Sequence, residues 1–291
     1  RVRVKIIIAM KKVFLLIVCV VLVLNTYASH FSGGEIRYEF NGTNYDVYLS
    51  VYKLCEKNSA SLPSSAAIKL NSVSQSVNQT IALNFLSFDT VNISCPSSAS
   101  ICLNPNGTIP GYITATFKGT VSLPSTASDW VLSYTSGARI AGIVNLTNSA
   151  TMYLHTNIDN STAINSNPLM ASSPSYFTLV NKNTVIPLQS IDPEGDVLQY
   201  ALVAPQTAAG VNATYATGYS ATTPFGSTGT ATINTTNNTL TLNSPSQGAF
   251  ALCLRVREYR NSVLIGEYIR EFTIAVLAGT SAGVTIPRPT S

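Results

Sequence analysis

Three carboxylates lie within five residues in the second half of the chain, in the segment Asp192-Pro193-Glu194-Gly195-Asp196. Carboxylate oxygens are ligands that Ca²⁺ prefers, and the glycine allows a tight bend that brings them together. Asp192, Glu194 and Asp196 are therefore candidate calcium ligands. A simpler interpretation is a type I turn, in which Asp192, Pro193 and Gly195 occupy favoured positions. Because Ca²⁺ takes six to eight oxygens, further ligands would have to come from elsewhere, and both interpretations stay open.

Few other residues could carry chemistry. The histidines are His30 and His155, and neither belongs to a nucleophile elbow, a phosphate-binding loop or a His-Glu-x-x-His pattern. His155 lies in an extended Tyr-Leu-His segment, which favours a structural role. The acids are scattered, without the paired carboxylates of a glycosidase. We therefore expect a protein that is not an enzyme, with no catalytic or cofactor-binding residues.

The cysteines suggest one disulfide. Cys95 and Cys102 bracket a short segment that a disulfide could close, so we expect these two to be bonded. Cys55 and Cys253 fall in different predicted domains, and a bond between them is not expected. Cys19 lies in a stretch that we expect to be removed. Disulfides are typical of secreted proteins.

The first residues predict secretion. A basic start at Met10, an apolar stretch over residues 13–24 and small residues up to Ala28 form a signal peptide over residues 10–28. Residues 1–9 are interpreted as upstream translation, and the mature chain is expected to begin at Ser29. The apolar stretch is shorter than the roughly 20 residues of a membrane span. We therefore expect an extracellular protein with no membrane span in the mature chain.

The charge balance argues against nucleic acid as a partner. The chain has 17 basic and 13 acidic residues, but five of the basic ones lie within residues 1–12. The remainder has 17 − 5 = 12 basic residues against 13 acidic ones. Such a chain has no excess of positive charge for binding phosphates.

Alternating apolar residues predict an all-β protein, and no segment shows a sustained helical period. We expect two tandem Ig-like or cadherin-like β-sandwich domains, over residues 29–170 and 171–277, followed by a linker-like tail over 278–291. The Asn- and Ser-rich residues 157–173 are interpreted as the connection between the domains. Strands are expected near residues 35–40, 45–52, 80–88, 112–121, 130–134, 151–156, 184–188, 198–203, 230–233 and 239–242.

The segment 248–277 predicts a long β-hairpin that turns at Asn261-Ser262. A two-residue loop alone would place Leu252 opposite Glu271, an apolar residue against a charged one. A shift of one residue places Leu252 opposite Phe272, and burial favours that register strongly. We therefore predict a bulge or a three-residue loop. The same shift pairs Phe250 with Ile274 and Arg257 with Glu267.

Several segments, in this order, resemble the large secreted surface proteins of Bacteroidota bacteria that carry gliding-motility-associated modules. They are His30–Ile36, Val51–Cys55, Leu123–Tyr134, Asp192–Leu202 and Arg255–Glu267. The resemblance implies export by the type IX route and a place at the cell surface. It also implies a non-enzymatic structural or adhesion role, as a spacer or presenting element, with other surface proteins or glycans as partners. The chain differs where the family has further cysteines, at Ser125–Ser128 and Ser136–Arg139.

Two features concern sugars. Asp89-Thr90-Val91 resembles the O-glycosylation motif of Bacteroidota, which makes Thr90 a candidate O-glycosylation site. The alternative function is a carbohydrate-binding module that uses exposed tyrosines as platforms. The 14 tyrosines favour this alternative, whereas the single tryptophan argues against it.

Overall fold

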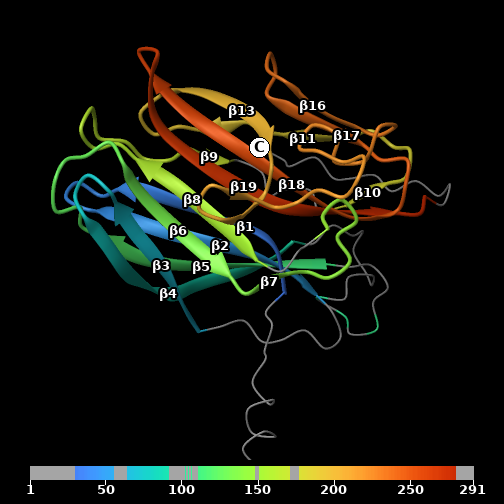
Figure 1. Ribbon diagram of the computed structural model, residues 1–291, viewed down its shortest axis with the longest axis horizontal. Coiled ribbons are helices and arrows are strands. Elements are labelled where there is room, and N and C mark those ends of the chain that lie inside the picture. Colours follow the sequence, from blue (N-terminus) through green and yellow to red (C-terminus); the bar gives the residue numbers. More distant parts are fainter. Residues whose placement is uncertain are drawn as a thin grey trace, which may run out of the picture.

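The computed structural model describes residues 30–55, 64–91, 102, 104, 106, 111–147, 151–170 and 177–279. This part of the chain is all-β, as predicted, and contains no helix (Figure 1). The predicted signal peptide, residues 1–9 and residues 280–291 of the tail lie outside the described residues.

The first strands are β1 (His30–Phe40), β2 (Tyr45–Cys55), β3 (Ser65–Ser72), β4 (Val77–Val91), β5 (Gly111–Val121), β6 (Trp130–Ser136), β7 (Ala138–Arg139), β8 (Met152–Ile158) and β9 (Leu169–Met170). The later strands are β10 (Phe177–Leu179), β11 (Thr184–Pro187), β12 (Ser190–Ile191), β13 (Val197–Val203), β14 (Gln206–Ala208), β15 (Val211–Asn212), β16 (Thr230–Asn234), β17 (Thr239–Asn243), β18 (Gly248–Arg260) and β19 (Val263–Leu277).

Strands from the two ends of the described chain enclose the first core. In the order β1-β2-β5-β4-β3-β6-β8-β19, each strand pairs antiparallel with the next, and β19 pairs again with β1. Strand β4 pairs with different strands along its length. Its residues up to Asn84 pair with β3, and its residues from Asn84 onward pair with β5, with a bulge between Phe85 and Ser87. The enclosed side chains include Trp130, Tyr38 and Leu49.

The second core lies between the hairpin β18–β19 and a smaller sheet. The smaller sheet has the order β11-β17-β16, and its Leu240 and Leu242 face the hairpin's Leu252 and Phe272. Strand β13 extends the hairpin sheet on the far side of β18. Tyr52 of β2 and Tyr112 of β5 also belong to this core. The two cores are therefore joined, and residues from both predicted domains contribute to the second one.

The hairpin has the predicted register. Leu252 lies opposite Phe272, and Phe250–Ile274 and Arg257–Glu267 are also paired. The loop has two residues, Asn261 and Ser262, with φ angles of 51° and 66°, as in a type I′ turn. The register shifts between Glu258 and Tyr259, which is the predicted bulge.

Strand β1 approaches β19 very closely. Gly33 lies opposite Phe272, and a Cβ at Gly33 would overlap the carbonyl group of Glu271. Arg270 of β19 donates two hydrogen bonds, of 2.8 and 2.6 Å, to the carboxylate of Glu35 on β1. On the other side of β19, Arg139 donates hydrogen bonds of 2.5 and 2.9 Å to Glu271. Buried ion pairs thus fix β19 from both sides.

Residues 157–173, interpreted as the connection between the domains, are packed into the fold in their central part. Asn165, Ser166 and Asn167 are buried. Their side chains hydrogen-bond to strands on both sides, and β9 pairs with β12. The polar composition of this segment reflects buried hydrogen bonds, which a sequence pattern does not distinguish from exposure to water.

Candidate acidic site between the two cores

The predicted acidic turn joins β12 to β13. The main-chain N–H of Gly195 donates to the carbonyl of Asp192 at 3.3 Å, and Gly195 has a φ of 82°. Oδ1 of Asp192 accepts the N–H groups of Glu194 and Asp196, at 3.1 and 2.9 Å. One oxygen from each of the three carboxylates lies within 4.8 Å of the other two. The turn therefore forms, and it brings together the three predicted calcium ligands.

Each acid also has partners in the protein. Arg260 donates to both oxygens of Asp196, at 2.8 and 2.7 Å. Glu194 accepts the N–H of Ser166 at 3.2 Å. Oδ2 of Asp192, in contrast, is buried and has no hydrogen-bond partner among the described residues. A cation at this turn would gain that oxygen but would share Asp196 with the guanidinium group.

A fourth carboxylate, Glu258 of β18, lies in the protein interior close to this turn. It is fully buried, and its oxygens accept N–H groups from Asn165 at 2.6 Å and Asn167 at 2.8 Å. Burial, followed by the charges of Asp192 and Asp196, raises the pKa of Glu258 to about 8, against the lowering effect of the two amides. Transfer of a carboxylate from water into the protein disfavours its charged form.

The two asparagines hold Glu258 against the first core. Asn167 accepts hydrogen bonds from the N–H of Tyr38 at 3.1 Å and from the hydroxyl of Thr156 at 3.0 Å. Asn165 donates to the hydroxyl of Tyr38 at 3.1 Å as well as to Glu258. This network connects β1, β8 and β18, so a change of charge at Glu258 acts on all three strands.

Sequence reasoning missed Glu258, Asn165 and Asn167. One signal was available for Glu258. It continues the alternation of Leu252, Leu254 and Val256, which places it on the buried face of the hairpin. For the asparagines, no comparable signal exists, because their burial depends on contacts with β1 and β18 that are distant in the sequence.

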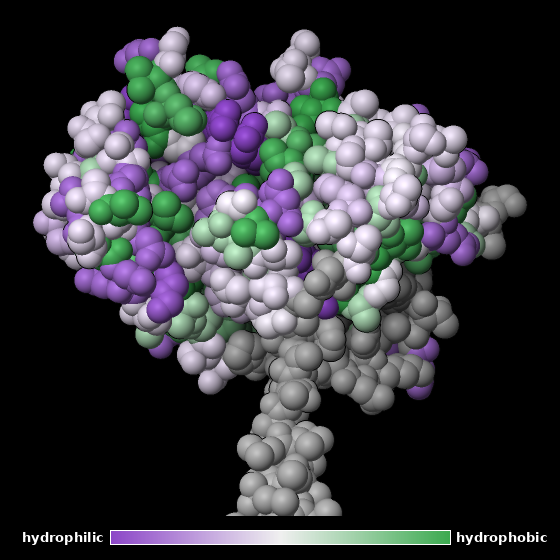
Figure 2. All heavy atoms as spheres, viewed as in Figure 1, coloured by the Kyte–Doolittle hydropathy of each residue, from purple (hydrophilic) through white to green (hydrophobic). Residues whose placement is uncertain are grey.

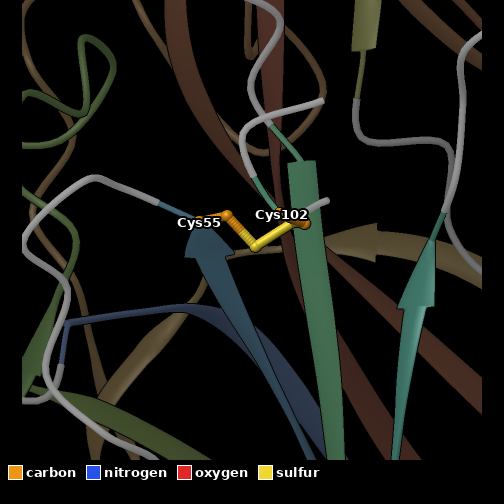
Figure 3. The surroundings of a disulfide bond; sticks show 2 residues. All are labelled: Cys55 and Cys102. Carbon is orange, nitrogen blue, oxygen red and sulfur yellow. A yellow bond between two sulfur atoms is a disulfide. The ribbon is translucent and has the colours of Figure 1, made fainter. Parts of the chain in front are cut away.

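The predicted disulfide is wrong in one partner. Cys102 is bonded to Cys55, not to Cys95 (Figure 3). Cys55 ends β2 and lies opposite Gly111, the first residue of β5. The pairing of β2 with β5 therefore brings the segment before Gly111 to Cys55, with a Cα–Cα distance of 5.2 Å, within the range for a disulfide. Cys95 lies outside the described residues, and the buried Cys253 forms no disulfide within the described part of the chain.

The two sugar-related predictions concern Thr90 and the tyrosines. Thr90 lies on β4, opposite Ile113 of β5, and is half-buried. The tyrosines of the described chain are buried or half-buried, and none of these is exposed. An exposed tyrosine platform would favour a carbohydrate-binding module. The described tyrosines form no such platform. Figure 2 shows apolar side chains in small groups between polar ones on the face in view.

Comparisons with known proteins do not identify the chain. No family model, no curated protein and no solved structure matches it. Within the described residues, no helix is long and apolar enough to cross a membrane.

Proposed function

We propose that this chain is a non-enzymatic module of a secreted cell-surface protein, which acts as a rigid spacer or presents adhesive elements to other surface proteins or glycans. The observation that carries the proposal is the double use of β19. This strand completes the pairing around the first core and forms one wall of the second core. Bending between the cores would break strand pairing and the buried ion pairs of Arg270 and Arg139.

Three further points support a place outside the cell. The sequence predicts a signal peptide over residues 10–28. The Cys55–Cys102 disulfide suits an oxidising compartment. The resemblance to Bacteroidota surface proteins implies type IX export and gliding-motility-associated partners. Decoration of Thr90 by O-linked glycans belongs to the same proposal.

Protease treatment of intact source cells tests the location. We expect loss of the protein from intact cells at the same protease dose that spares a cytoplasmic control protein. Survival of the protein in intact cells, with digestion only after lysis, would contradict the proposal.

Calorimetry of the mature chain tests the rigidity. Because β19 belongs to both cores, we expect one cooperative unfolding transition whose calorimetric and van't Hoff enthalpies agree. The variant Arg270→Met weakens the connection between β19 and β1 and should broaden or split the transition. Two separate transitions in the unmodified chain would show that the cores unfold independently, which a rigid spacer does not allow.

The acidic turn supports calcium as a stiffening ligand within this proposal. Asp192, Glu194 and Asp196 would hold the ion, and its charge would offset their mutual repulsion. We expect millimolar calcium to raise the Tm, a chelator to reverse the effect, and Asp192→Asn to abolish it. Glu39→Gln, at an exposed carboxylate of β1, is the matched control and should keep the response. A Tm that does not respond to calcium leaves only the turn.

A further inference from the structure

The outer edge of β13 is an unusual feature of the hairpin sheet. Strand β13 pairs with β18 over all of its residues, from Val197–Tyr259 to Val203–Cys253, without a bulge. In the described part of the chain, no strand pairs with the opposite edge of β13, which ends the sheet. In an antiparallel strand, every second residue directs its N–H and C=O groups toward the free side. This edge therefore offers regular hydrogen-bonding groups to another strand.

The edge lacks the features that usually prevent pairing with other chains. Charged side chains, prolines and bulges protect exposed strand edges in soluble proteins. The sequence of β13 is Val-Leu-Gln-Tyr-Ala-Leu-Val, with no charge and no proline. Val197 is 65% exposed. Leu198 and Leu202 point to the second core but are only partly buried there, so an added strand would cover more of them.

The sequence of β13 is nearly a palindrome around Tyr200. If a second copy pairs antiparallel with this strand about Tyr200, Val197 lies opposite Val203 of the other copy. Leu198 then lies opposite Leu202, and Gln199 opposite Ala201. Identical apolar side chains would thus meet on both faces of the joined sheet, with Gln199 against Ala201 as the one mismatch, and the register uses all residues of β13.

The charges next to β13 do not oppose this arrangement. The acidic turn precedes β13 and ends at Asp196, whereas the residues after the strand, from Ala204 to Gln206, are neutral. In the antiparallel register, Asp196 lies opposite Ala204 of the other copy. The two acidic turns are then separated by the length of the strand, roughly 25 Å at about 3.4 Å per residue, which exceeds the Debye length of about 8 Å at physiological salt.

We propose that the chain associates with a second copy of itself through the β13 edges, which join antiparallel about Tyr200 and make one continuous sheet across two molecules. This inference does not depend on the proposed surface function. An edge contact of one short strand from each copy is small compared with a stable dimer interface, so we expect a weak dimer that forms at high local concentration.

Sedimentation equilibrium of the full mature chain tests the proposal. The protein concentration runs from about 10 μM to about 1 mM, a range that suits small transient interfaces. We expect the average mass to rise from one chain toward two. The test variant is Gln199→Glu with Ala201→Glu. Within one chain the new acids lie opposite Arg257 and Arg255 and should leave folding intact. In the dimer they face each other in two like-charge pairs, which should weaken the dimer about tenfold or more.

Two variants make the result specific to this register. Gln199→Glu alone keeps its new acid opposite Arg257 within the chain but meets the neutral Ala201 of the other copy, so it should weaken the dimer less than the double Glu variant does. Val73→Glu, at an exposed residue between β3 and β4, should leave the dimer unchanged. A chain that remains single at 1 mM would overturn the proposal. So would a dimer that the double Glu variant does not weaken, or one that Val73→Glu abolishes.

Discussion

Replacement of Glu258 by Gln should change how stability depends on pH. Glu258 is buried and hydrogen-bonded to two neutral amides, and in the described residues its carboxylate has no cation within salt-bridge distance. Burial raises its pKa from 4.5 to about 8. The folded protein therefore binds a proton at Glu258 more tightly than the unfolded chain does.

The sign and size of the effect follow from this difference. Because the folded pKa is raised, the protonated group contributes stability fully below about pH 4.5, and this contribution is lost as the pH rises toward 8. The shift from 4.5 to about 8 corresponds to a loss of up to about 5 kcal/mol, at 1.36 kcal/mol per pKa unit. A glutamine is neutral at every pH and has a similar shape, so the variant should not lose this stability.

Urea unfolding between pH 4.5 and 8.5 is the assay. We expect the free energy of unfolding of the Gln variant, relative to that of the unmodified protein, to increase with pH across this range, by several kcal/mol at the upper end. Glu39→Gln removes an exposed carboxylate from β1 and should follow the unmodified protein. Parallel curves for Glu258→Gln and the unmodified protein would refute the assignment of this pH dependence to Glu258.

Other substitutions test the covalent and ionic connections. Cys55→Ser opens a loop of 47 residues and should lower the free energy of unfolding by about 4 kcal/mol through loop entropy. Reduction of the disulfide in the unmodified protein should have the same effect, and an unchanged free energy of unfolding after reduction would contradict the prediction. Arg139→Met leaves the carboxylate of Glu271 buried without its partner and should cost about 3–5 kcal/mol, measured by urea unfolding; a neutral effect would show that the pair is dispensable. Ser262→Gly relieves a positive φ of 66° and should raise the stability by up to about 1 kcal/mol, whereas a lower Tm would argue against the type I′ turn.

The local features of the fold could be predicted from the sequence because period and burial determine them. The alternation of Phe250, Leu252 and Leu254 predicts the strand, and the mismatch of Leu252 with Glu271 predicts the bulge. The acidic turn follows from Asp192, Pro193 and Gly195. All of these arguments use residues that are near one another in the chain.

What could not be predicted depends on contacts between distant segments. Cys102 finds Cys55 because β2 pairs with β5, and nearness in sequence to Cys95 carries no information about that pairing. Asn165 and Asn167 look like residues of a connection between domains until β1 and β18 are placed beside them. Likewise, no local pattern shows that β19 will close the sheet around the first core.

The position of β19 near the end of the chain affects the order in which the protein can fold during its synthesis. The ion pair between Arg270 and Glu35 joins residues 235 positions apart, and contacts of such separation slow folding. Strand β1 leaves the ribosome long before its neighbour β19 does. Its edge must stay unpaired during that interval. The first core is therefore completed only after residues 263–277 have followed, so nearly the whole described chain must be made before this core can finish folding.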